Sequence, residues 1–453
     1  MIKPKDIFGL RYARFRNYLN CLFLFFLLAI FTVYLDKNIH AFSAESLTYA
    51  NVFLYTFIFI FSIRKNGLLS YYSIFLIFLF IFVFSRYFVS LLGYSIDSFC
   101  AFNMTPDIYR ITSIINFSFL LSSFIPSLFF KNEYKFKLSS LLELEKITKK
   151  LIFFILPFHF IFLSVYAFQI LTNDISLVYL DSKDLIFKMS GLSPLNITFK
   201  LLTLFLMGYF CSLPKKLDKK IIVFSLITFF IFFIIGFKKI FIGYLFFLLW
   251  YFFILKKLPK RYIVFLSILI PLAILSNSLR YINLFGYNNL TFDMVDFLFH
   301  NSQTYCVYNY YFLLDISNQP ISPFLSPLTD RLSSLLNMFG YNFEIKNNMS
   351  NFIARILNPD FPANGTGTAF FIEVYDFFGL VFGSLFIFFV FFIFHIFEKN
   401  LFCKRFYLFF SFLFIPFIVL LPRGYFFSIL INLIFMFILY YFLYKIYLLM
   451  KKT

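Results

Sequence analysis

The chain has 453 residues, of which 61% are hydrophobic and 81 are phenylalanine, and its formal net charge is +19. This apolar fraction excludes an ordinary soluble domain. The basic residues are spread over separate short connections, which excludes a nucleic-acid-binding surface as their explanation. A polytopic helical membrane protein is the class that remains, since each crossing needs roughly 20 apolar residues.

Twelve apolar stretches follow one another and predict an all-α membrane protein with about 12 transmembrane helices. They cover residues 18–35, 49–63, 68–92, 108–130, 151–172, 195–213, 221–237, 240–255, 262–279, 377–397, 406–421 and 425–444. The basic start runs into the first stretch without a small-residue cleavage site, so we expect no cleaved signal peptide. The chain then divides into a bundle of about nine spans at 1–279, a polar segment that re-enters the membrane at 280–376, and about three spans at 377–453.

Basic residues recur in every second connection, and this alternation predicts the orientation. The basic connections are 1–17, 64–65, 131–150, 215–220, 256–261, 398–405 and 445–453. Because short basic loops stay in the cytoplasm, we expect both termini there and an even number of spans. The other connections then face outward. Among them is the long segment 281–365, with three basic residues against six acidic ones.

Residues 221–255 fit either one long helix interrupted at GFKK (236–239) or a hairpin of two short helices. Both ends of the stretch are strongly basic, with KKLDKK at 215–220 and KKLPKR at 256–261. Both ends therefore favour the cytoplasm, which predicts the hairpin. Lys238 and Lys239 would then lie at its outer tip, against the usual distribution of positive charge.

Basic residues on the predicted outer side form a candidate phosphate site. They are Arg86, Lys238, Lys239, Arg280, Arg331 and Arg423. An arginine offers a planar fork that matches phosphate oxygens, and a lysine offers a compact charge for the same group. The alternative is that these side chains reach lipid headgroups or pair with acidic residues of the loop.

A glycine-rich turn opens the tenth apolar stretch, in NGTGTAFFIEVYDFFGLVFG (364–383). Thr366 or Thr368 is expected to cap the following helix, and both hydroxyls are candidate substrate contacts. Glu373 and Asp376 are three residues apart and share one helical face. A carboxylate at membrane depth costs roughly 2.5–3.5 kcal/mol, so it faces a polar site or a partner. Either a functional carboxylate or a structural Glu–Arg pair in an interfacial turn fits this pattern.

The chain resembles the Wzy-type O-antigen and oligosaccharide repeat-unit polymerases of bacterial inner membranes, including the enterobacterial common antigen polymerase. The resemblance covers the whole architecture and four local motifs: GFKK (236–239), SNSLRY (276–281), GTGTAFFIEVYDFFG (365–379) and PRG (422–424). One departure is the Lys238-Lys239 pair, where the family pattern has an arginine.

The resemblance implies an inverting glycosyltransferase, with a GT-C-like helical bundle, that uses no nucleotide sugar. It would pass a glycan from undecaprenyl diphosphate to the terminal sugar of another lipid-linked repeat at the periplasmic face. The sequence contains no Walker motif, no dinucleotide-binding glycine pattern and no convincing Asp-x-Asp, so no cofactor is expected. The implied partners are the lipid-linked oligosaccharide, the bilayer and a chain-length-determining membrane protein, without nucleic acid.

This chemistry assigns roles to the candidate residues. The outer lysines and arginines would stabilise the diphosphate leaving group electrostatically. Glu373 is the first candidate for the base that accepts the acceptor's proton, with Asp376, Asp330 and His300 as alternatives. Aromatic and amide residues of the outer segment suit sugar binding, although an ordinary polar loop contains the same residues: Tyr281, Tyr287, Asn288, Asn289, Tyr305, Tyr308, Tyr310 and Tyr341.

The remaining histidines and cysteines add little chemistry. His159 and His395 lie within spans without a spaced carboxylate or cysteine, so no metal site is expected. Only Cys100 and Cys306 fall on the predicted outer side, where a disulfide is chemically possible.

Two other functions fit the architecture. An O-antigen ligase would depend on a periplasmic histidine, for which only His300 is suited. A flippase of lipid-linked sugars would carry charges at mid-span positions, whereas here the charges gather at the outer boundary. The charge distribution therefore favours chemistry at the outer face over transport.

Overall fold

The computed structural model describes most of the predicted bundle. The described residues are 20, 23–96, 100, 103–130, 138, 140–172, 194–215, 217–234, 238–254, 303–314, 369–403, 405–419, 421–423, 426, 430, 434, 437–438, 441–442 and 445. They form helices and no strand, which confirms the all-α class for this part of the chain. Five of these helices are long and apolar enough to cross a membrane, in agreement with a multi-pass membrane protein.

The first half of the described chain alternates long helices with short connections. It contains a helical stretch at 23–37, η1 (Ile39–Ala41), α2 (Ala44–Asn66), α3 (Tyr71–Leu79), η2 (Phe80–Phe84), α4 (Ser85–Ser90), α5 (Pro106–Phe129) and α6 (Leu142–Thr172). Ser43, Ser70 and Thr105 cap the starts of α2, α3 and α5, where each side chain accepts a backbone N–H. The element η2 is a π-helical turn that joins α3 and α4 into one span, Tyr71–Ser90.

The second half contains α8 (Pro194–Cys211), α9 (Lys219–Ile234), α10 (Lys238–Ile254), α13 (Gln303–Leu313), α16 (Phe370–Lys399), α17 (Arg405–Ile418) and η5 (Leu421–Arg423). The helices α9 and α10 pack against each other, which confirms the predicted hairpin of two short helices. The predicted span at 262–279 lies outside the described residues, and the one at 425–444 is described only in part.

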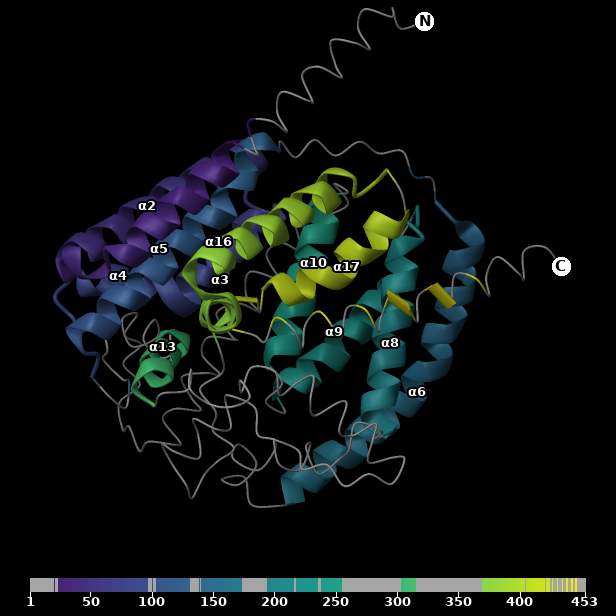
Figure 1. The fold of residues 1–453 in the computed structure, drawn as a ribbon. Helices are drawn as coiled ribbons and strands as arrows, with labels where there is room; N and C mark the ends of the chain where they lie inside the picture. Colours follow the sequence, from purple (N-terminus) through teal and green to yellow (C-terminus); the bar gives the residue numbers. More distant parts are fainter. Residues whose placement is uncertain are drawn as a thin grey trace, which may run out of the picture.

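The helices form a bundle in which neighbours in space are often distant in sequence. Figure 1 shows α2, α5 and α16 side by side in one part of the molecule, and α6 beside α8 in another. The helices α10 and α17 lie between these groups, since α17 packs against both α10 and α8. The short helix α13 lies against η2, α5 and α16, although the charges predict that it belongs to the outer segment.

The pairing of α5 with α16 depends on small residues. Buried serines recur along α5, and Gly383 of α16 lies so close to α5 that an added Cβ would be 2.6 Å from Cζ of Phe119. Small residues favour helix association in membranes because they let two backbones approach and form many van der Waals contacts. Helix α5 therefore packs closely against α16 near Gly383.

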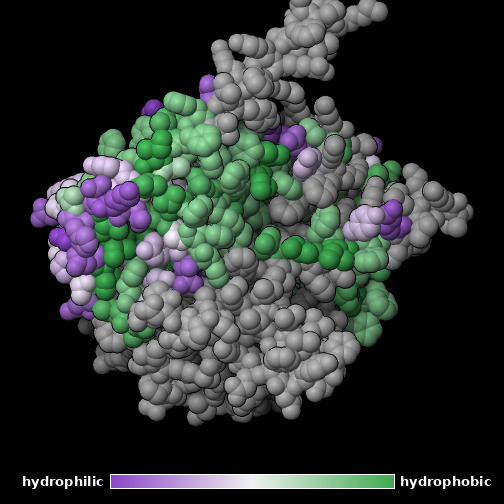
Figure 2. Space-filling view, in the orientation of Figure 1, coloured by the Kyte–Doolittle hydropathy of each residue, from purple (hydrophilic) through white to green (hydrophobic). Residues whose placement is uncertain are grey.

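The surface of the described helices is largely apolar, as expected of a lipid-facing bundle. Figure 2 shows hydrophobic residues over much of the face in view, and hydrophilic residues gathered at the end formed by α2, α4 and α5. Large apolar side chains remain exposed on several helices, for example Phe53, Phe154 and Phe382. A soluble protein rarely exposes so many large apolar side chains, whereas a bilayer solvates them.

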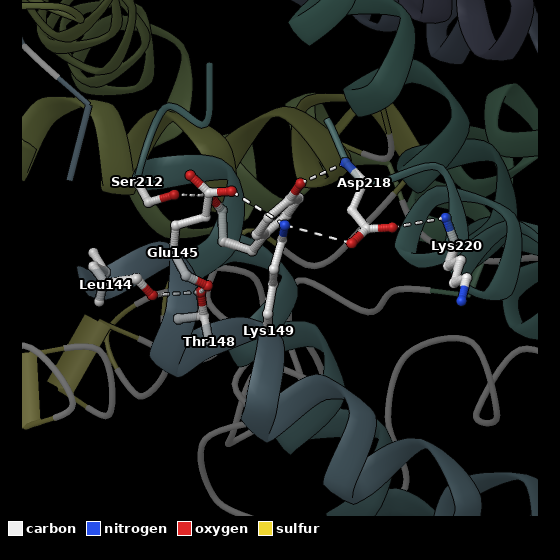
Figure 3. A network of polar contacts seen from close by, with 8 residues as sticks. Leu144, Glu145, Thr148, Lys149, Ser212, Asp218 and Lys220 are labelled. Atoms are coloured by element: carbon white, nitrogen blue, oxygen red, sulfur yellow. Dashed lines mark hydrogen bonds and ion pairs between the residues drawn. The ribbon is translucent and has the colours of Figure 1, made fainter. Parts of the chain in front are cut away.

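A polar network joins α6, α8 and the start of α9 (Figure 3). The Nζ atom of Lys149 lies 3.2 Å from the Glu145 carboxylate and 3.4 Å from that of Asp218. Asp218 also accepts the backbone N–H of Lys220, and its own N–H donates to the Tyr209 hydroxyl. The helix α6 begins at Leu142, nine residues before the predicted span at 151–172. The charged residues that precede the apolar stretch are therefore part of the same helix.

Candidate functional site

The N-terminal part of α16 carries the two predicted carboxylates and is set off from the rest of the helix by Gly379. Gly379 has φ 65° and ψ −169°, a conformation reached essentially by glycine alone. Residues Phe370–Phe378 therefore form a short helix with a direction of their own. Glu373 and Asp376 both lie on this short helix, three residues apart and hence on one face.

Glu373 is fully buried and tied to a neighbouring turn. Its Oε2 atom accepts a hydrogen bond of 2.8 Å from the backbone N–H of Phe426, three residues after Arg423. The rings of Phe370 and Phe426 lie 5.4 Å apart and reinforce the same contact. Since a buried carboxylate requires hydrogen-bonding partners, this bond stabilises its position. It also brings the start of α16 to the turn that carries Arg423.

Two arginines lie at or near the π-helical turn η2 of the span Tyr71–Ser90. The Arg423 guanidinium carbon lies 5.8 Å from the ring centroid of Phe82, within η2. Arg86, four residues further along the same span, is fully buried and donates to the Ile96 carbonyl at 2.8 Å. Its guanidinium lies 5.9 Å from the ring of Tyr305 in α13. π-Helical turns are rare and often mark functional sites. Here η2 brings one arginine toward α16 and the other toward α13.

Residues 304–311 of the helix α13 are buried, and its C-terminal end is exposed. Its Tyr308 hydroxyl donates to Oδ1 of Asn116 at 2.7 Å, and Asn116 donates to the Tyr87 hydroxyl at 3.0 Å. Tyr305, Tyr308 and Tyr310 are each at most 3% exposed. The sequence left open whether these three tyrosines contact sugars or serve the fold. Their burial favours a role in the fold.

A disulfide between Cys100 and Cys306 fixes α13 to the connection before α5. The sequence left open whether these two cysteines form a disulfide, and in the structure they are bonded. Cys100 also lies 3.5 Å from Nη1 of Arg86, so the bridge, the arginine and α13 form one unit. A covalent link across 206 residues of sequence restricts the separation of these two outer segments.

Asp376 contacts α13 through Tyr311. The Tyr311 hydroxyl donates a hydrogen bond of 2.7 Å to Oδ1 of Asp376. Tyr311 is buried, whereas Asp376 keeps part of its surface exposed. Burial and the neighbouring carboxylate raise the pKa of Tyr311 far above its ordinary value, so the hydroxyl stays protonated and donates. Two carboxylates and two arginines thus surround the junction of α16, α13, η2 and η5.

The remaining predicted site residues fall in two groups. The helix α10 begins at Lys238, so Lys238 and Lys239 occupy its first turn beside the end of α9. The others lie outside the described residues: Arg280, His300, Asp330, Arg331, Thr366 and Thr368, with Tyr281, Tyr287, Asn288, Asn289 and Tyr341 of the loop. The structure therefore brings together Glu373, Asp376 and Arg423 of the predicted set.

Sequence reasoning missed Tyr311 and the Tyr87–Asn116–Tyr308 chain. Asn116 lies in the middle of an apolar span, where an amide side chain needs a hydrogen-bonding partner. Its position was thus a signal that another polar residue enters the bundle. Tyr311 offered no such signal, since a tyrosine-rich stretch is typical of surface loops as well.

Within the described part of the chain, neither histidine predicted to lie within a span belongs to a group of metal-binding side chains. His159 shares a hydrogen bond of 3.0 Å with Thr198, and the ring of His395 stacks on Phe130. Among the described residues, no group of three or more His, Cys, Asp or Glu side chains is arranged to hold a metal ion.

Comparison with known protein families identifies a match over nearly the whole chain. The model of a family described as O-antigen polysaccharide polymerase Wzy matches residues 18–453. The match starts at the first predicted span and includes every residue of the junction described above. No curated protein and no solved structure matches the chain significantly.

Proposed function

The chain belongs to the O-antigen polysaccharide polymerase Wzy family, which makes it a polymerase of O-antigen repeat units, and we propose that its donor is a glycan on undecaprenyl diphosphate. In this reaction the growing glycan passes to the terminal sugar of another lipid-linked repeat at the periplasmic face. The observation that carries the proposal is the junction at which Glu373 contacts the turn of Arg423.

The proposed step forms one bond and breaks another. A hydroxyl oxygen of the acceptor sugar attacks the anomeric carbon of the donor glycan, on the side opposite the diphosphate. The bond between that carbon and the diphosphate oxygen breaks with its electron pair, and undecaprenyl diphosphate leaves. The hydroxyl proton passes to a carboxylate of the protein. Attack from the opposite side inverts the configuration of the donor sugar.

Arginine is suited to the leaving diphosphate, whose negative charge increases as the bond breaks. A positioned cation near that charge lowers the barrier most when water is excluded. Arg423 is partly buried and lies beside the carboxylate-bearing helix, which supports this role. Lys238, Lys239, Arg280 and Arg331 are proposed as further phosphate contacts, and Thr366 and Thr368 as substrate contacts, on sequence grounds alone.

The two carboxylates have different surroundings, and these favour different roles. Glu373 is enclosed, and its Oε2 accepts the Phe426 amide, which favours a structural part in holding the Arg423 turn. Asp376 is partly exposed one turn further along the helix. A proton acceptor must reach the acceptor hydroxyl within about 3 Å. We therefore propose that Asp376 is the base that accepts the hydroxyl proton, with Glu373 as the alternative.

The orientation in the bacterial inner membrane also belongs to the proposal, with both termini in the cytoplasm. Disulfides persist in the periplasm and are rare in the cytosol, so the Cys100–Cys306 bridge supports a periplasmic position for α13. Reporter fusions should place position 320 outside and positions 140, 218 and 258 inside. A cytoplasmic location of position 320 would contradict the proposed orientation, because every proposed site residue would then lie on the cytoplasmic side of the membrane.

A deletion strain tests the activity. Lipopolysaccharide from cells that lack this protein should show core bearing a single repeat, because ligation continues when polymerisation stops. Bare core would instead indicate a ligase or a flippase of lipid-linked sugars. A chain-length-determining membrane protein is the proposed partner, and its loss should change the ladder's length distribution without abolishing polymerisation.

A further inference from the structure

Tyr311 provides the contact between the buried outer helix α13 and the carboxylate Asp376. The hydroxyl lies 2.7 Å from Oδ1 of Asp376, a distance typical of a strong O–H···O⁻ bond. Tyr311 is 2% exposed, and its ring packs edge-on against Phe312. The donor therefore has little freedom to turn away from the carboxylate.

The rest of α13 fixes the Tyr311 hydroxyl in place. Five residues earlier, Cys306 is bonded to Cys100, and three residues earlier, Tyr308 donates to Asn116. These anchors come from two different parts of the bundle, the connection before α5 and α5 itself. A hydrogen-bond donor held from several sides orients an acceptor better than one on a free loop.

We propose that Tyr311 is a positioning residue, which holds the Asp376 carboxylate in the orientation that accepts the acceptor's proton. This inference rests on the proposed function and extends it, because it gives a residue of the outer segment a role in positioning the proposed base. Tyr311 would act through Asp376 and not touch the sugar. The disulfide would then contribute to activity indirectly, since it fixes the helix that carries Tyr311.

Other titratable groups near the pair do not replace this contact. Glu373 lies one turn earlier on α16 and is occupied with the Phe426 amide. Tyr375 is adjacent to Asp376 in sequence, and its ring lies 6.4 Å from that of Tyr311. Within the described part of the chain, Tyr311 is the hydroxyl that the geometry places on Asp376.

The test compares Tyr311→Phe with Tyr72→Phe in purified protein reconstituted in lipid nanodiscs. The substrate is the lipid-linked repeat that accumulates in cells lacking this protein. Tyr311→Phe keeps the ring and removes the donor, so turnover should fall by up to about 100-fold while KM stays nearly unchanged. Tyr72→Phe removes a buried hydroxyl at the start of α3, which shares a hydrogen bond of 3.0 Å with Ser123 of α5, and should leave turnover per folded molecule near normal.

A double-mutant cycle separates positioning from folding. If Tyr311 acts through Asp376, the Tyr311→Phe, Asp376→Asn double variant should be no slower than Asp376→Asn alone. Additive losses, or normal turnover in a folded Tyr311→Phe variant beside an inactive Asp376→Asn, would overturn the role of Tyr311 only. Normal turnover in Asp376→Asn would instead overturn the assignment of the base, and with it this inference.

Discussion

Helix α16 carries a fully buried glutamate near each of its ends, and the two make the same kind of contact. Glu373 accepts the backbone N–H of Phe426 at 2.8 Å, and Glu398 accepts that of Tyr71 at 3.0 Å. Burial and a hydrogen bond therefore do not distinguish a catalytic carboxylate from a structural one. What distinguishes the two ends is the set of groups around each glutamate.

The C-terminal end has the features of a structural contact. Tyr71 is the first residue of α3, whose N-terminal N–H groups lack partners within the helix and favour a negative charge. Nearby, Lys65 donates to the Ser127 carbonyl at 2.8 Å, at the end of α5. At this end charged side chains complete helix termini.

The N-terminal end carries the groups that we propose as the reaction site. A second carboxylate, Asp376, lies one turn from Glu373 and is partly exposed. Arg423 lies in the turn next to Glu373, and α13 contributes Tyr311. If the comparison is correct, changes at the two ends should separate into losses of activity and losses of stability.

The largest expected effect is that of Asp376→Asn. Without a base, polymerisation should fall by roughly 10²–10⁴-fold, the usual contribution of such a group. The lipid-linked repeat should still bind and accumulate. Turnover with the purified repeat measures the loss, and Glu398→Gln at the other end of α16 is the control. A stable Asp376→Asn variant with an unchanged glycan ladder would remove Asp376 from the mechanism.

Arg423→Ala should have the next largest effect, a loss of about 10²–10³-fold in turnover, because a preorganised charge partner of the leaving group is removed. Arg423→Lys should recover only part of the activity, since lysine lacks the two-pronged fork. Lys399→Ala is the matched control, because Lys399 makes a similar contact with the Phe130 ring, at 5.7 Å. Equal activity of the alanine and native proteins would contradict a role in diphosphate binding.

Glu373→Gln and Glu398→Gln compare the two buried contacts directly. Each should lower the free energy of unfolding by about 1.5–3 kcal/mol, the range for hydrogen bonds to charged groups. Thermal unfolding in detergent measures this loss. Glu373→Gln should also slow turnover modestly, because the Arg423 turn loses its anchor. A Glu373→Gln protein of native stability and no activity would instead identify Glu373 as the base, the first candidate from the sequence.

Much of the bundle could be predicted because long apolar runs report membrane spans directly. The stretches at 49–63 and 108–130 correspond to α2 (Ala44–Asn66) and α5 (Pro106–Phe129). The hairpin of α9 and α10 followed from the basic residues on both sides. Apolar runs and clusters of basic residues are properties of short stretches of sequence, so they predict spans and their connections without knowledge of the fold.

The tertiary features of the site could be predicted only in part. Asp376 and Glu373 were evident as carboxylates in an apolar run, but their partners come from α13 and from the chain after η5. The sequence QTYCVYNYYFL of α13 is polar enough for a surface loop. Its burial is helped by Asn116 and Asp376, which accept hydrogen bonds from the hydroxyls of Tyr308 and Tyr311. Such pairings depend on packing across hundreds of residues, which composition does not encode.

Gly379→Ala should have the smallest effect and tests whether the direction of Phe370–Phe378 matters. The added Cβ meets no atom within 4 Å, so the cost arises from the backbone alone, at φ 65°. A side chain in this conformation costs about 1–3 kcal/mol. Gly67→Ala at the end of α2 is the control, since this glycine also has a positive φ, 87°, and an added Cβ would meet no atom within 4 Å. Both variants should lose stability in thermal unfolding. Only Gly379→Ala should also lose turnover per folded molecule, by several-fold, because relief of the strain shifts Asp376 relative to Tyr311 and Arg423. Equal turnover in the two variants would mean that the break at Gly379 serves packing and not the site.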